Sequence, residues 1–393
     1  MPSHKKEPLK EIAFSFLKLG IFAFGGPAAH IAMMEEEFVR RHRWLSREKF
    51  LDLLGAASLI PGPSSTELAI YIGFLHAGWL GLVLAGICFI MPAAIIVTTL
   101  AWLYVQFGSL PQTISILYGI KPVVVAVILQ ALWGLGRSAL KTRFLAVICL
   151  VSFAVSFLGI NPLTILIGAG SVVGICNWIG GLREGKRSSI SSLAILLMVL
   201  PLAFLVQTVA AWTSRIHFSL NLTSLFLVFL KIGSVVFGSG YVLLAFLRND
   251  LVVNLHWLND SQLLDAVIVG QVTPGPVFTT ATFIGYLLFG LPGAFVATVG
   301  IFLPAFLLVA ISGPIVSRIR QSLVAASFLD GVIVGSLALM AYVTYELGRS
   351  TLIDLITVTW AIVCSLLLIR FRVNSAWLVL TGAAIGFLVF LLR

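Results

Sequence analysis

Residues 18–27 read Lys-Leu-Gly-Ile-Phe-Ala-Phe-Gly-Gly-Pro, and this stretch decides the fold because residues 231–240 repeat it as Lys-Ile-Gly-Ser-Val-Val-Phe-Gly-Ser-Gly. A second pair keeps the same register, since Pro61-Gly62-Pro63 returns 213 positions later as Pro274-Gly275-Pro276. Shared composition would not hold one register over so many glycines, prolines and charged residues. The chain therefore consists of two homologous copies of one unit.

The duplication divides the chain into three parts. We expect an N-terminal repeat at 1–185, a linker at 186–218 that carries an extra transmembrane helix, and a C-terminal repeat at 219–393. From Gly73 onward the offset between the copies is 212, as in its match to Gly285, and a single deleted residue explains this change.

The composition identifies the class of protein. Of the 393 residues, 60% are hydrophobic and 10% are charged, and the mean hydropathy is +1.09. Soluble proteins carry about 25% charged residues, so this chain could not cover a soluble surface. We expect an all-α polytopic membrane protein and exclude a secreted, disordered or nucleic-acid-binding one. The net charge of +10 is assigned to cytoplasmic loops. The four cysteines lie in apolar runs without metal-type spacing, so we expect neither metal nor cofactor.

Long apolar runs give the crossing count, because a helix needs about 20 residues to span a bilayer. Thirteen runs cover approximately 9–34, 50–77, 79–105, 112–136, 144–160, 163–181, 193–212, 222–247, 262–289, 291–315, 322–346, 352–369 and 374–392. Thirteen full crossings would place the basic segments 1–10 and 137–143 opposite loop 35–49. If 9–40, 50–77 and their counterparts are broken hairpins that enter and return on one side, nine crossings remain. Nearly all loop Lys and Arg then share one face. We prefer this arrangement, which makes the N-terminus cytoplasmic.

The basic residues also predict how the copies are oriented. Loop 35–49 carries five Lys or Arg, whereas its counterpart 248–262 carries only Arg248. The bias reverses at the next pair, since 106–112 has none and 318–324 has two. Because basic loops stay on the cytoplasmic side, the copies are expected to be inverted relative to each other in the membrane.

Each expected hairpin contains a helix break rich in Gly and Pro, which permit unusual backbone angles and remove N–H groups. Broken backbone at membrane depth is tolerated where it is buried in protein or lines a wet cavity. A helix that starts there directs N–H groups and a positive dipole end into the cavity, which suits an anion. The candidate substrate-binding residues are the break positions, the hydroxyls after them and one lysine per copy: Lys18, Gly25, Gly26, Pro61, Gly62, Pro63, Ser64, Ser65, Thr66, Lys231, Gly238, Ser239, Gly240, Pro274, Gly275, Pro276, Thr279 and Thr280. The alternative is a set of Pro-kinked helices whose hydroxyls only cap.

Lys18 and Lys231 occupy the same register. A lysine at mid-membrane costs about 2.5–3.5 kcal/mol on insertion scales, and a neighbouring anion would offset this cost. Snorkelling to the interface is the alternative for both. Lys121 is matched by Ile333, so we expect it to be snorkelled or structural.

Glu67 and His30 are the candidate proton-coupling residues. A lone carboxylate beside an anion site could exchange a proton, and the second copy has Thr280 in the place of Glu67. The alternatives are a helix-start carboxylate satisfied by local N–H groups and a packed or interfacial histidine. Asp52 and Asp265 match between the copies and could cap helices or pair with loop arginines.

Motifs for hydrolytic, metal or nucleotide chemistry are missing from the sequence, which has no His-Glu-x-x-His, Cys-x-x-Cys or Walker pattern. We therefore expect a transporter that draws its energy from a gradient, and no enzyme. Three alternatives stay open: a passive anion channel on the same fold, a transporter of a different small anion, and a membrane enzyme that uses Glu67 and His30.

The sequence also resembles a known family. The pattern comprises Phe16-Leu17-Lys18-Leu19-Gly20, Phe24-Gly25-Gly26-Pro27-Ala28-Ala29-His30-Ile31, Arg40-Arg41, Trp44-Leu45 and Pro61-Gly62-Pro63-Ser64-Ser65-Thr66. With its repeat in the second copy, it resembles the chromate ion transporter family in its long-chain, two-domain form. The resemblance implies a bacterial inner-membrane carrier that expels chromate by proton antiport, with sulfate as a related oxyanion. The family's conserved positions fall on Lys18, Gly25, Gly26, Pro27, Pro61, Gly62 and Pro63.

Together these observations predict a secondary active transporter for a tetrahedral divalent oxyanion. Its partners would be the oxyanion, protons and the lipid bilayer, without nucleic acid, and a homodimer is left open. Hairpin tips from both copies would form one site near the midplane. Rocking of one copy against the other would expose that site alternately.

Overall fold

The computed structural model describes residues 9–23, 26–58, 60–108, 110–183, 219–236, 240–319, 323–371 and 373–392. Every regular element within these ranges is a helix, so the expected all-α fold is confirmed. The expected linker helix near 193–212 and the hairpin tips Gly25, Gly238 and Ser239 lie outside the described residues.

The two copies present the same order of elements. The first contains α1 (Leu9–Phe22), α2 (Gly26–Glu35), the π-helix η1 (Glu36–Arg41), α3 (Arg47–Ala57), α4 (Ser64–Phe107), α5 (Pro111–Ala139), α6 (Arg143–Ser156) and α7 (Pro162–Arg183). The second contains α9 (Leu222–Val235), η2 (Gly240–Val242), α10 (Leu243–Leu247), the π-helix η3 (Arg248–Asn254), α11 (Asp260–Val272), η4 (Val277–Thr279), α12 (Thr280–Ile319), α13 (Leu323–Thr351), α14 (Leu355–Phe371) and α15 (Ser375–Leu392). In each copy a broken hairpin and a short helix precede a long kinked helix, a second long helix and a terminal pair.

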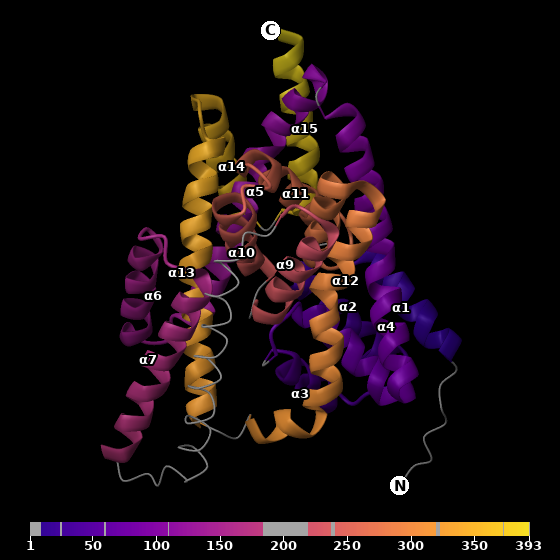
Figure 1. Cartoon of the computed structure of the whole chain (residues 1–393), viewed down its shortest axis with the longest axis vertical. Helices are drawn as coiled ribbons and strands as arrows, with labels where there is room; N and C mark the ends of the chain where they lie inside the picture. The colour runs from indigo at the N-terminus through magenta and orange to yellow at the C-terminus, as the bar shows by residue number, and fades with distance from the viewer. Residues whose placement is uncertain are drawn as a thin grey trace.

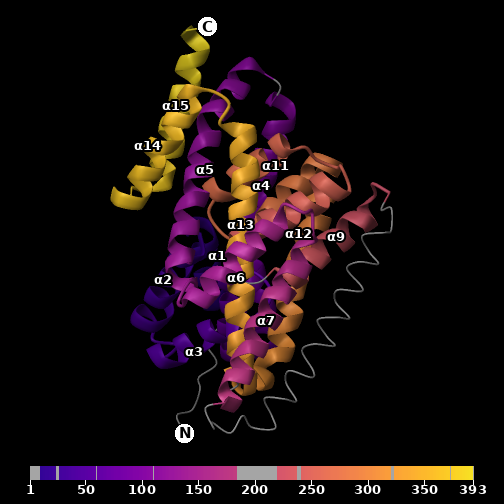
Figure 2. The same cartoon turned by 90° about the vertical axis from the view of Figure 1, so that its left-hand side faces the viewer.

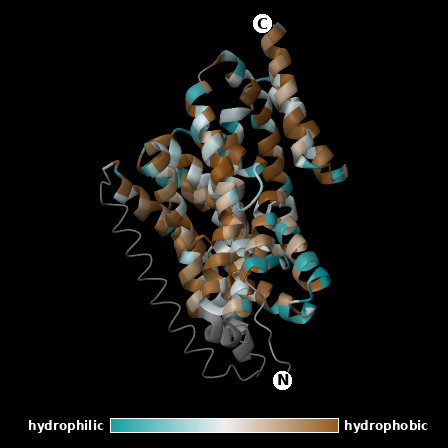
Figure 3. Cartoon of the chain, turned by 90° about the vertical axis from the view of Figure 1, so that its right-hand side faces the viewer, coloured by the Kyte–Doolittle hydropathy of each residue, from teal (hydrophilic) through white to brown (hydrophobic). Residues whose placement is uncertain are grey.

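Several helices are suited to cross a bilayer. Five described segments are long and apolar enough: Ser64–Phe107, Pro111–Ala139, Pro162–Ile179, Val277–Ile311 and Ala326–Thr351. The shorter apolar helices α6, α14 and α15 accompany them. Hydrophobic residues run along most helices, and hydrophilic ones collect mainly at turns and helix ends (Figure 3). The chain is therefore a multi-pass membrane protein, and the count of nine crossings stays a prediction.

The local structure of the hairpin region is repeated in register. Arg43 and His256, which are 213 positions apart, are both non-glycine residues with a positive φ, of 53° and 54°. The next short helix is capped in each copy by the side chain at the equivalent position, Ser46 for α3 and Asn259 for α11. The sequence register is thus also a structural register.

The first hairpin turns back on itself, as the broken-hairpin arrangement predicts. The ring of Phe16 in α1 lies 4.9 Å from that of Phe38 in η1, and Phe38 stacks 4.9 Å from Trp44. Trp44 in turn stacks on His76, with 4.3 Å between ring centroids, near the end of the first arm of α4. This row of rings ties both arms of the hairpin to α4. Re-entry on one side of the bilayer stays a prediction.

The long helix of each copy is kinked at a glycine. Ala77 and Gly78 leave the helical conformation inside α4, and Phe289 and Gly290 do so inside α12. The φ angles of the two glycines are 61° and 62°, in the left-handed region that glycine adopts without steric penalty. The separate apolar runs of the sequence, 50–77 and 79–105, therefore meet in one kinked helix.

Each kink brings two helical arms into backbone contact. A Cβ atom on Gly73 would lie 2.3 Å from the carbonyl oxygen of Gly81. The equivalent pair in α12 is Gly285 and Gly293, where the distance would be 2.2 Å. A side chain at these positions would collide with backbone, so only glycine allows the arms to approach this closely.

The copies interlock by exchanging helix partners. Helix α5 of the first copy packs against α14 and α15 of the second, whereas α13 of the second packs against α6 and α7 of the first (Figures 1 and 2). Glycines permit close backbone contact at both places. A Cβ on Gly119 would lie 2.0 Å from Gly382 O, and one on Gly331 would lie 2.5 Å from Ala169 O. Small residues at crossings are a general device for helix association in membranes.

Gly73→Ala should destabilise the protein by about 1–3 kcal/mol, because the new methyl group meets the rigid backbone of Gly81. The matched control is Gly134→Ala in α5, where no atom lies within 4 Å of the added Cβ. That change should be neutral or stabilising by up to about 1 kcal/mol, the helix-propensity difference. Thermal denaturation of the purified protein in detergent compares the two variants. Equal melting temperatures would contradict the contact between the arms of α4.

Candidate functional site

The two Pro-Gly-Pro breaks are bonded to the opposite copy through the backbone. The amide of Gly62 donates a hydrogen bond of 2.7 Å to the carbonyl of Val236, directly after α9. The amide of Gly275 donates a bond of 3.0 Å to the carbonyl of Ala23, directly after α1. Ala23 and Val236 are equivalent positions, 213 residues apart, so exchanging the copies exchanges the two bonds. Each break thus lies against the tip of the other copy's first hairpin.

Both break glycines need the space that a side chain would fill. Their φ angles are +137° at Gly62 and +88° at Gly275, which side chains disfavour. A Cβ on Gly275 would lie 2.6 Å from the Cβ of Ala93 in α4, and one on Gly62 would lie 3.7 Å from the Cβ of Ala305 in α12. Ala93 and Ala305 are also equivalent positions. Each break therefore also touches the long helix of the other copy.

Helix α4 begins in the first break with buried polar side chains. Pro63 is its N-cap residue and offers no side-chain cap, but its carbonyl accepts the amides of Thr66 at 2.7 Å and Glu67 at 3.1 Å. Ser65, Thr66 and Glu67 are at most 2% exposed. Of the predicted hydroxyls of the first copy, those of Ser65 and Thr66 are thus buried beside the break, and Ser64 is half-buried.

His30 links this helix start to the second break. Its Nδ1 lies 3.3 Å from Ser65 Oγ, and its Nε2 lies 3.0 Å from the carbonyl oxygen of Ala23. A carbonyl only accepts, so Nε2 carries the hydrogen and Nδ1 accepts from the Ser65 hydroxyl. The same Ala23 carbonyl accepts the Gly275 amide. His30 is 1% exposed, and both of its ring nitrogens have a protein partner.

Glu67 differs from its neighbours because its carboxyl group has no partner. It is fully buried, and neither carboxyl oxygen has a hydrogen-bond partner among the described residues. Its Oε1 lies 2.3 Å from where a Cβ of Gly62 would be, so the side chain folds back against the break. The hydroxyl of Thr66 is likewise buried without a partner in the described ranges. Local N–H groups do not satisfy this carboxylate, because the nearby amides donate to Pro63.

The equivalent positions in the second copy are satisfied. The hydroxyl of Thr279, which matches Thr66, donates to the carbonyl of Pro276 at 2.8 Å. The hydroxyl of Thr280, which matches Glu67, donates to the carbonyl of Val277 at 2.8 Å. At this break the hydroxyls turn back onto the helix start, as the capping interpretation describes.

Each candidate lysine is held by a carboxylate of its own hairpin. Lys18 Nζ lies 3.4 Å from Glu37 Oε1, and Lys231 Nζ lies 2.9 Å from Asp250 Oδ2. The two residues of each pair are 19 positions apart. Sequence reasoning missed both acids, although their matching register was a visible signal. That the two lysines bind an anion stays a prediction. An anion would have to compete with these carboxylates for the lysine ammonium groups.

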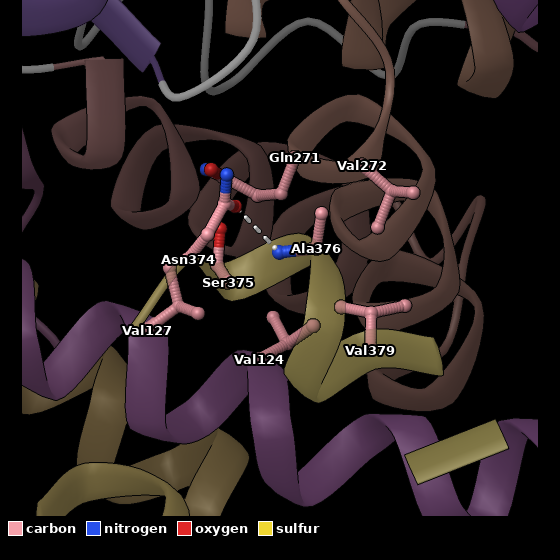
Figure 4. A pocket seen from close by; sticks show the side chains of 8 residues that line it. All are labelled: Val124, Val127, Gln271, Val272, Asn374, Ser375, Ala376 and Val379. Carbon is pink, nitrogen blue, oxygen red and sulfur yellow. Dashed lines mark hydrogen bonds between the residues drawn. The ribbon is translucent and has the colours of Figure 1, made fainter. Parts of the chain in front are cut away.

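Two cavities near the candidate residues differ in size. Lys18 lines a pocket of about 350 Å³ at the base of the first hairpin. Its remaining walls are Lys10, Glu11, Phe14, Ser15, Glu37, Arg41 and His42. Near the second break, a cavity of about 30 Å³ is lined by Gln271, Asn374, Ser375 and apolar residues of α5 and α15 (Figure 4). That volume suits about one water molecule.

A further ion pair occurs in both copies, with the acidic and basic residues exchanged between the equivalent positions. Glu35 Oε1 lies 3.4 Å from Arg47 Nε, and the equivalent residues Arg248 and Asp260 have Nε and Oδ1 at 2.8 Å. Arg248 also pairs with Glu346 at 3.0 Å. In the first copy the pair joins the last residue of α2 to the start of α3, and in the second it joins the first residue of η3 to the start of α11. The copies therefore keep the contact and reverse its charges.

The expectation that Asp265 pairs with a loop arginine is wrong. Its Oδ1 lies 3.1 Å from Lys121 Nζ, and its Oδ2 accepts the hydroxyl of Tyr104 at 2.9 Å. Helices α5 and α11, which come from opposite copies, pack together and bury Asp265 away from the loops. Lys121 therefore holds a buried carboxylate of the other copy, which agrees with the structural role that was one of the two expectations for it. In the described part of the chain, no three His, Cys, Asp or Glu side chains gather as a metal site would require.

Fold and site together define a class: an all-helical, multi-pass membrane protein made of two interlocked copies of a broken-helix unit. The chain belongs to the chromate transporter family, whose model matches residues 10–175 and 223–387. The resemblance read from the sequence is thereby confirmed. This is a family of transporters, which removes support from the enzyme alternative.

Curated relatives extend over nearly the whole chain. It is 32% identical over 381 residues to a chromate transport protein of Cupriavidus metallidurans, covering 96% of this chain and 92% of the relative. It is 33% identical over 361 residues to a probable chromate transport protein of Synechococcus elongatus, covering 90% and 88%. It is also 33% identical over 387 residues to a chromate transport protein of Pseudomonas aeruginosa, covering 95% and 91%. No solved structure matches the chain.

Proposed function

We propose that this protein is a secondary active transporter that exports a tetrahedral oxyanion across the bacterial inner membrane, driven by the proton gradient. Chromate is the first substrate and sulfate the second. Family membership and the names of the three relatives support the substrate. The observation that carries the mechanism is the reciprocal bonding of Gly62 to Val236 and of Gly275 to Ala23.

This bonding couples the two breaks mechanically. Because each break is bonded to the hairpin tip of the other copy, movement of one copy against the other changes both breaks together. The amides of Gly62 and Gly275 donate to protein carbonyls in the present conformation. Movement that separates the copies would free these amides for an anion at the start of the following helix. Alternating access then follows from one rocking motion.

The course of the long helices supports inversion of the copies. In Figure 1, α4 rises to the top of the molecule while the second arm of α12 descends. A Cβ on Gly86 would lie 2.3 Å from the Phe306 ring, and farther along α4 the ring of Tyr104 lies 5.3 Å from Phe283, earlier in α12. The long helices therefore run in opposite directions past each other. Since both are candidate spans, this arrangement favours an inverted repeat.

Transport in everted membrane vesicles tests the proposed function. Vesicles with the protein should accumulate radiolabelled chromate against its gradient when respiration energises the membrane. A protonophore should abolish the accumulation, and excess sulfate should reduce it. Vesicles without the protein are the control. Equilibration without accumulation would indicate a passive channel, and uptake equal to the control would leave chromate without support as the substrate.

Lys231→Gln should lower chromate transport by about tenfold or more, since a hydrogen bond from a charged group contributes about 1.5–3 kcal/mol. The control is Lys141→Gln, which removes an exposed ion pair with Asp330 and should change transport by less than about twofold. The double variant Lys231→Gln/Asp250→Asn leaves no unpaired charge. Restored transport in this double variant would mean that Lys231 only neutralises Asp250 and does not bind the anion.

Inversion predicts opposite accessibility of two equivalent exposed positions, Arg40 and Val253. We would replace Cys88, Cys149, Cys176 and Cys364 by serine and introduce Arg40→Cys or Val253→Cys separately. A membrane-impermeant maleimide should label position 40 in everted vesicles and position 253 in intact spheroplasts, because the loops would lie on opposite faces. Labelling of both positions from the same face would refute the inversion.

A further inference from the structure

We propose that the two breaks have different roles and that Glu67 makes the first of them a proton-linked site. When an oxyanion binds at the first break, Glu67 takes up a proton, so that anion and proton are carried in the same direction. At the second break the hydroxyls of Thr279 and Thr280 serve as a fixed cap. This inference rests on the proposed function and assigns the coupling step to one residue.

The first part of the argument is the position of the carboxyl group. Glu67 lies in the first turn of α4, and its Oε1 folds back against the backbone of Gly62, inside the break. The Gly62 amide donates to Val236 and the Glu67 amide donates to Pro63. The carboxyl group is therefore fully buried at the proposed anion site, without a hydrogen bond or ion pair from the described residues.

The second part is the contrast with the other copy. Thr280 occupies the equivalent position and satisfies its hydroxyl on the carbonyl of Val277, while Thr279 does so on Pro276. At the first break the matching atoms, Thr66 Oγ1 and both Glu67 oxygens, have no partner in the described ranges. The polar atoms left for a ligand thus lie at the first break.

Electrostatics then gives the sign of the linkage. An ionised carboxylate at the start of α4 would repel an oxyanion placed there, and the repulsion is strong because the carboxyl group is buried. A protonated carboxyl group removes that repulsion and offers an O–H donor to the anion. Anion binding and protonation of Glu67 therefore favour each other, and by linkage each raises the affinity for the other by the same factor.

Other charged groups around the site are already compensated or distant. On α2, His30 is bonded to Ser65 and Ala23. On α1 and α9, Lys18 and Lys231 are paired with Glu37 and Asp250. On α3, Arg47 pairs with Glu35 of the preceding hairpin, and the other charged residues are Glu48, Lys49 and Asp52. Between Thr280 and Ser317, α12 contains no Asp, Glu, Lys, Arg or His. Among the described residues, Glu67 supplies the carboxyl group that lies against Gly62 of the break.

Joint transport still agrees with export. A dianion that leaves with one proton carries one net negative charge outward, and a membrane potential that is negative inside favours this movement. The electrical part of the proton gradient would then drive export. This direction of proton movement differs from the proton antiport that the family resemblance implies.

Proton uptake during anion binding tests the inference directly. Purified full-length protein in weakly buffered detergent solution, with a pH indicator, would be mixed with chromate or sulfate between pH 6 and pH 8, a range chosen around the neutral point. Sulfate stays a dianion throughout this range, so its pH dependence reports on the protein. We expect uptake of up to one proton per anion bound, and an affinity that rises about fivefold or more as the pH falls.

Variants separate this role from a structural one. Glu67→Gln keeps the shape, and it should bind the anion with an affinity independent of pH and without proton uptake. Glu67→Thr, which copies the second break, should behave in the same way. Thr344→Val is the matched control, because it removes a buried hydroxyl that bonds only to Met340 within α13, and it should keep the pH dependence of the wild type. Proton uptake unchanged in Glu67→Gln, or absent from a wild type that binds the anion, would overturn the inference. Failure of the wild type to bind either anion would instead overturn the proposed function, and this inference with it.

Discussion

The structure depends on a pair of backbone hydrogen bonds that neither copy could make alone. A helix break inside a membrane protein leaves amides that lipid cannot satisfy, so each must find an acceptor within the protein. Gly62 finds its acceptor at Val236, and Gly275 finds its acceptor at Ala23. These carbonyls become available because the first hairpin of each copy is broken at that point. Two breaks therefore satisfy each other across the interface between the copies.

The same constraint accounts for the glycines and for the exchanged helices. Gly62 and Gly275 must lie close to the long helix of the other copy, since a side chain at Gly275 would reach Ala93. Helices α5 and α13 then continue the exchange by packing on the terminal pair of the opposite copy. The breaks and the terminal helices of each copy all contact the other copy. A displacement of one copy therefore changes contacts along the whole interface. Rigid-body motion is the natural response of such an interlocked pair.

Much of this framework could be predicted from the sequence, because register is a one-dimensional property. The breaks and the matching lysines are visible as residues that recur at a fixed offset, whereas the sequence divided each long kinked helix into two separate apolar runs. Partners across the interface were not predictable in this way. Asp265 binds Lys121, which has no basic counterpart in the other copy, and this contact depends on how α5 and α11 meet in space. Likewise, Thr66 and Thr279 are the same residue at the same register, yet only the hydroxyl of Thr279 turns back onto its helix start.

The partners of the two candidate lysines were also not predicted from the sequence. The sequence places Lys18 and Lys231 near the breaks and predicts positive charge for an anion. It does not reveal that Glu37 and Asp250 hold these charges, although the acids recur at a fixed offset. Their counter-ions mean that positive charge near the site is balanced before any substrate arrives. Substrate charge must then be met by movement of these pairs, by freed backbone amides or by a proton.

The differences between the copies explain how a symmetric framework could perform a directional task. Under the proposed mechanism, equivalent contacts at the breaks would give two conformations of similar construction, one for each side of the membrane. The balance between these two conformations responds to a proton gradient only if a protein group gains or loses a proton when the anion binds. Glu67 supplies a titratable group at one break, while Thr280 leaves the other without one. A carboxyl group at position 280 would add a second titratable group to the site. In the proposed mechanism, both copies would share the motion, and Glu67 alone would couple it to a proton.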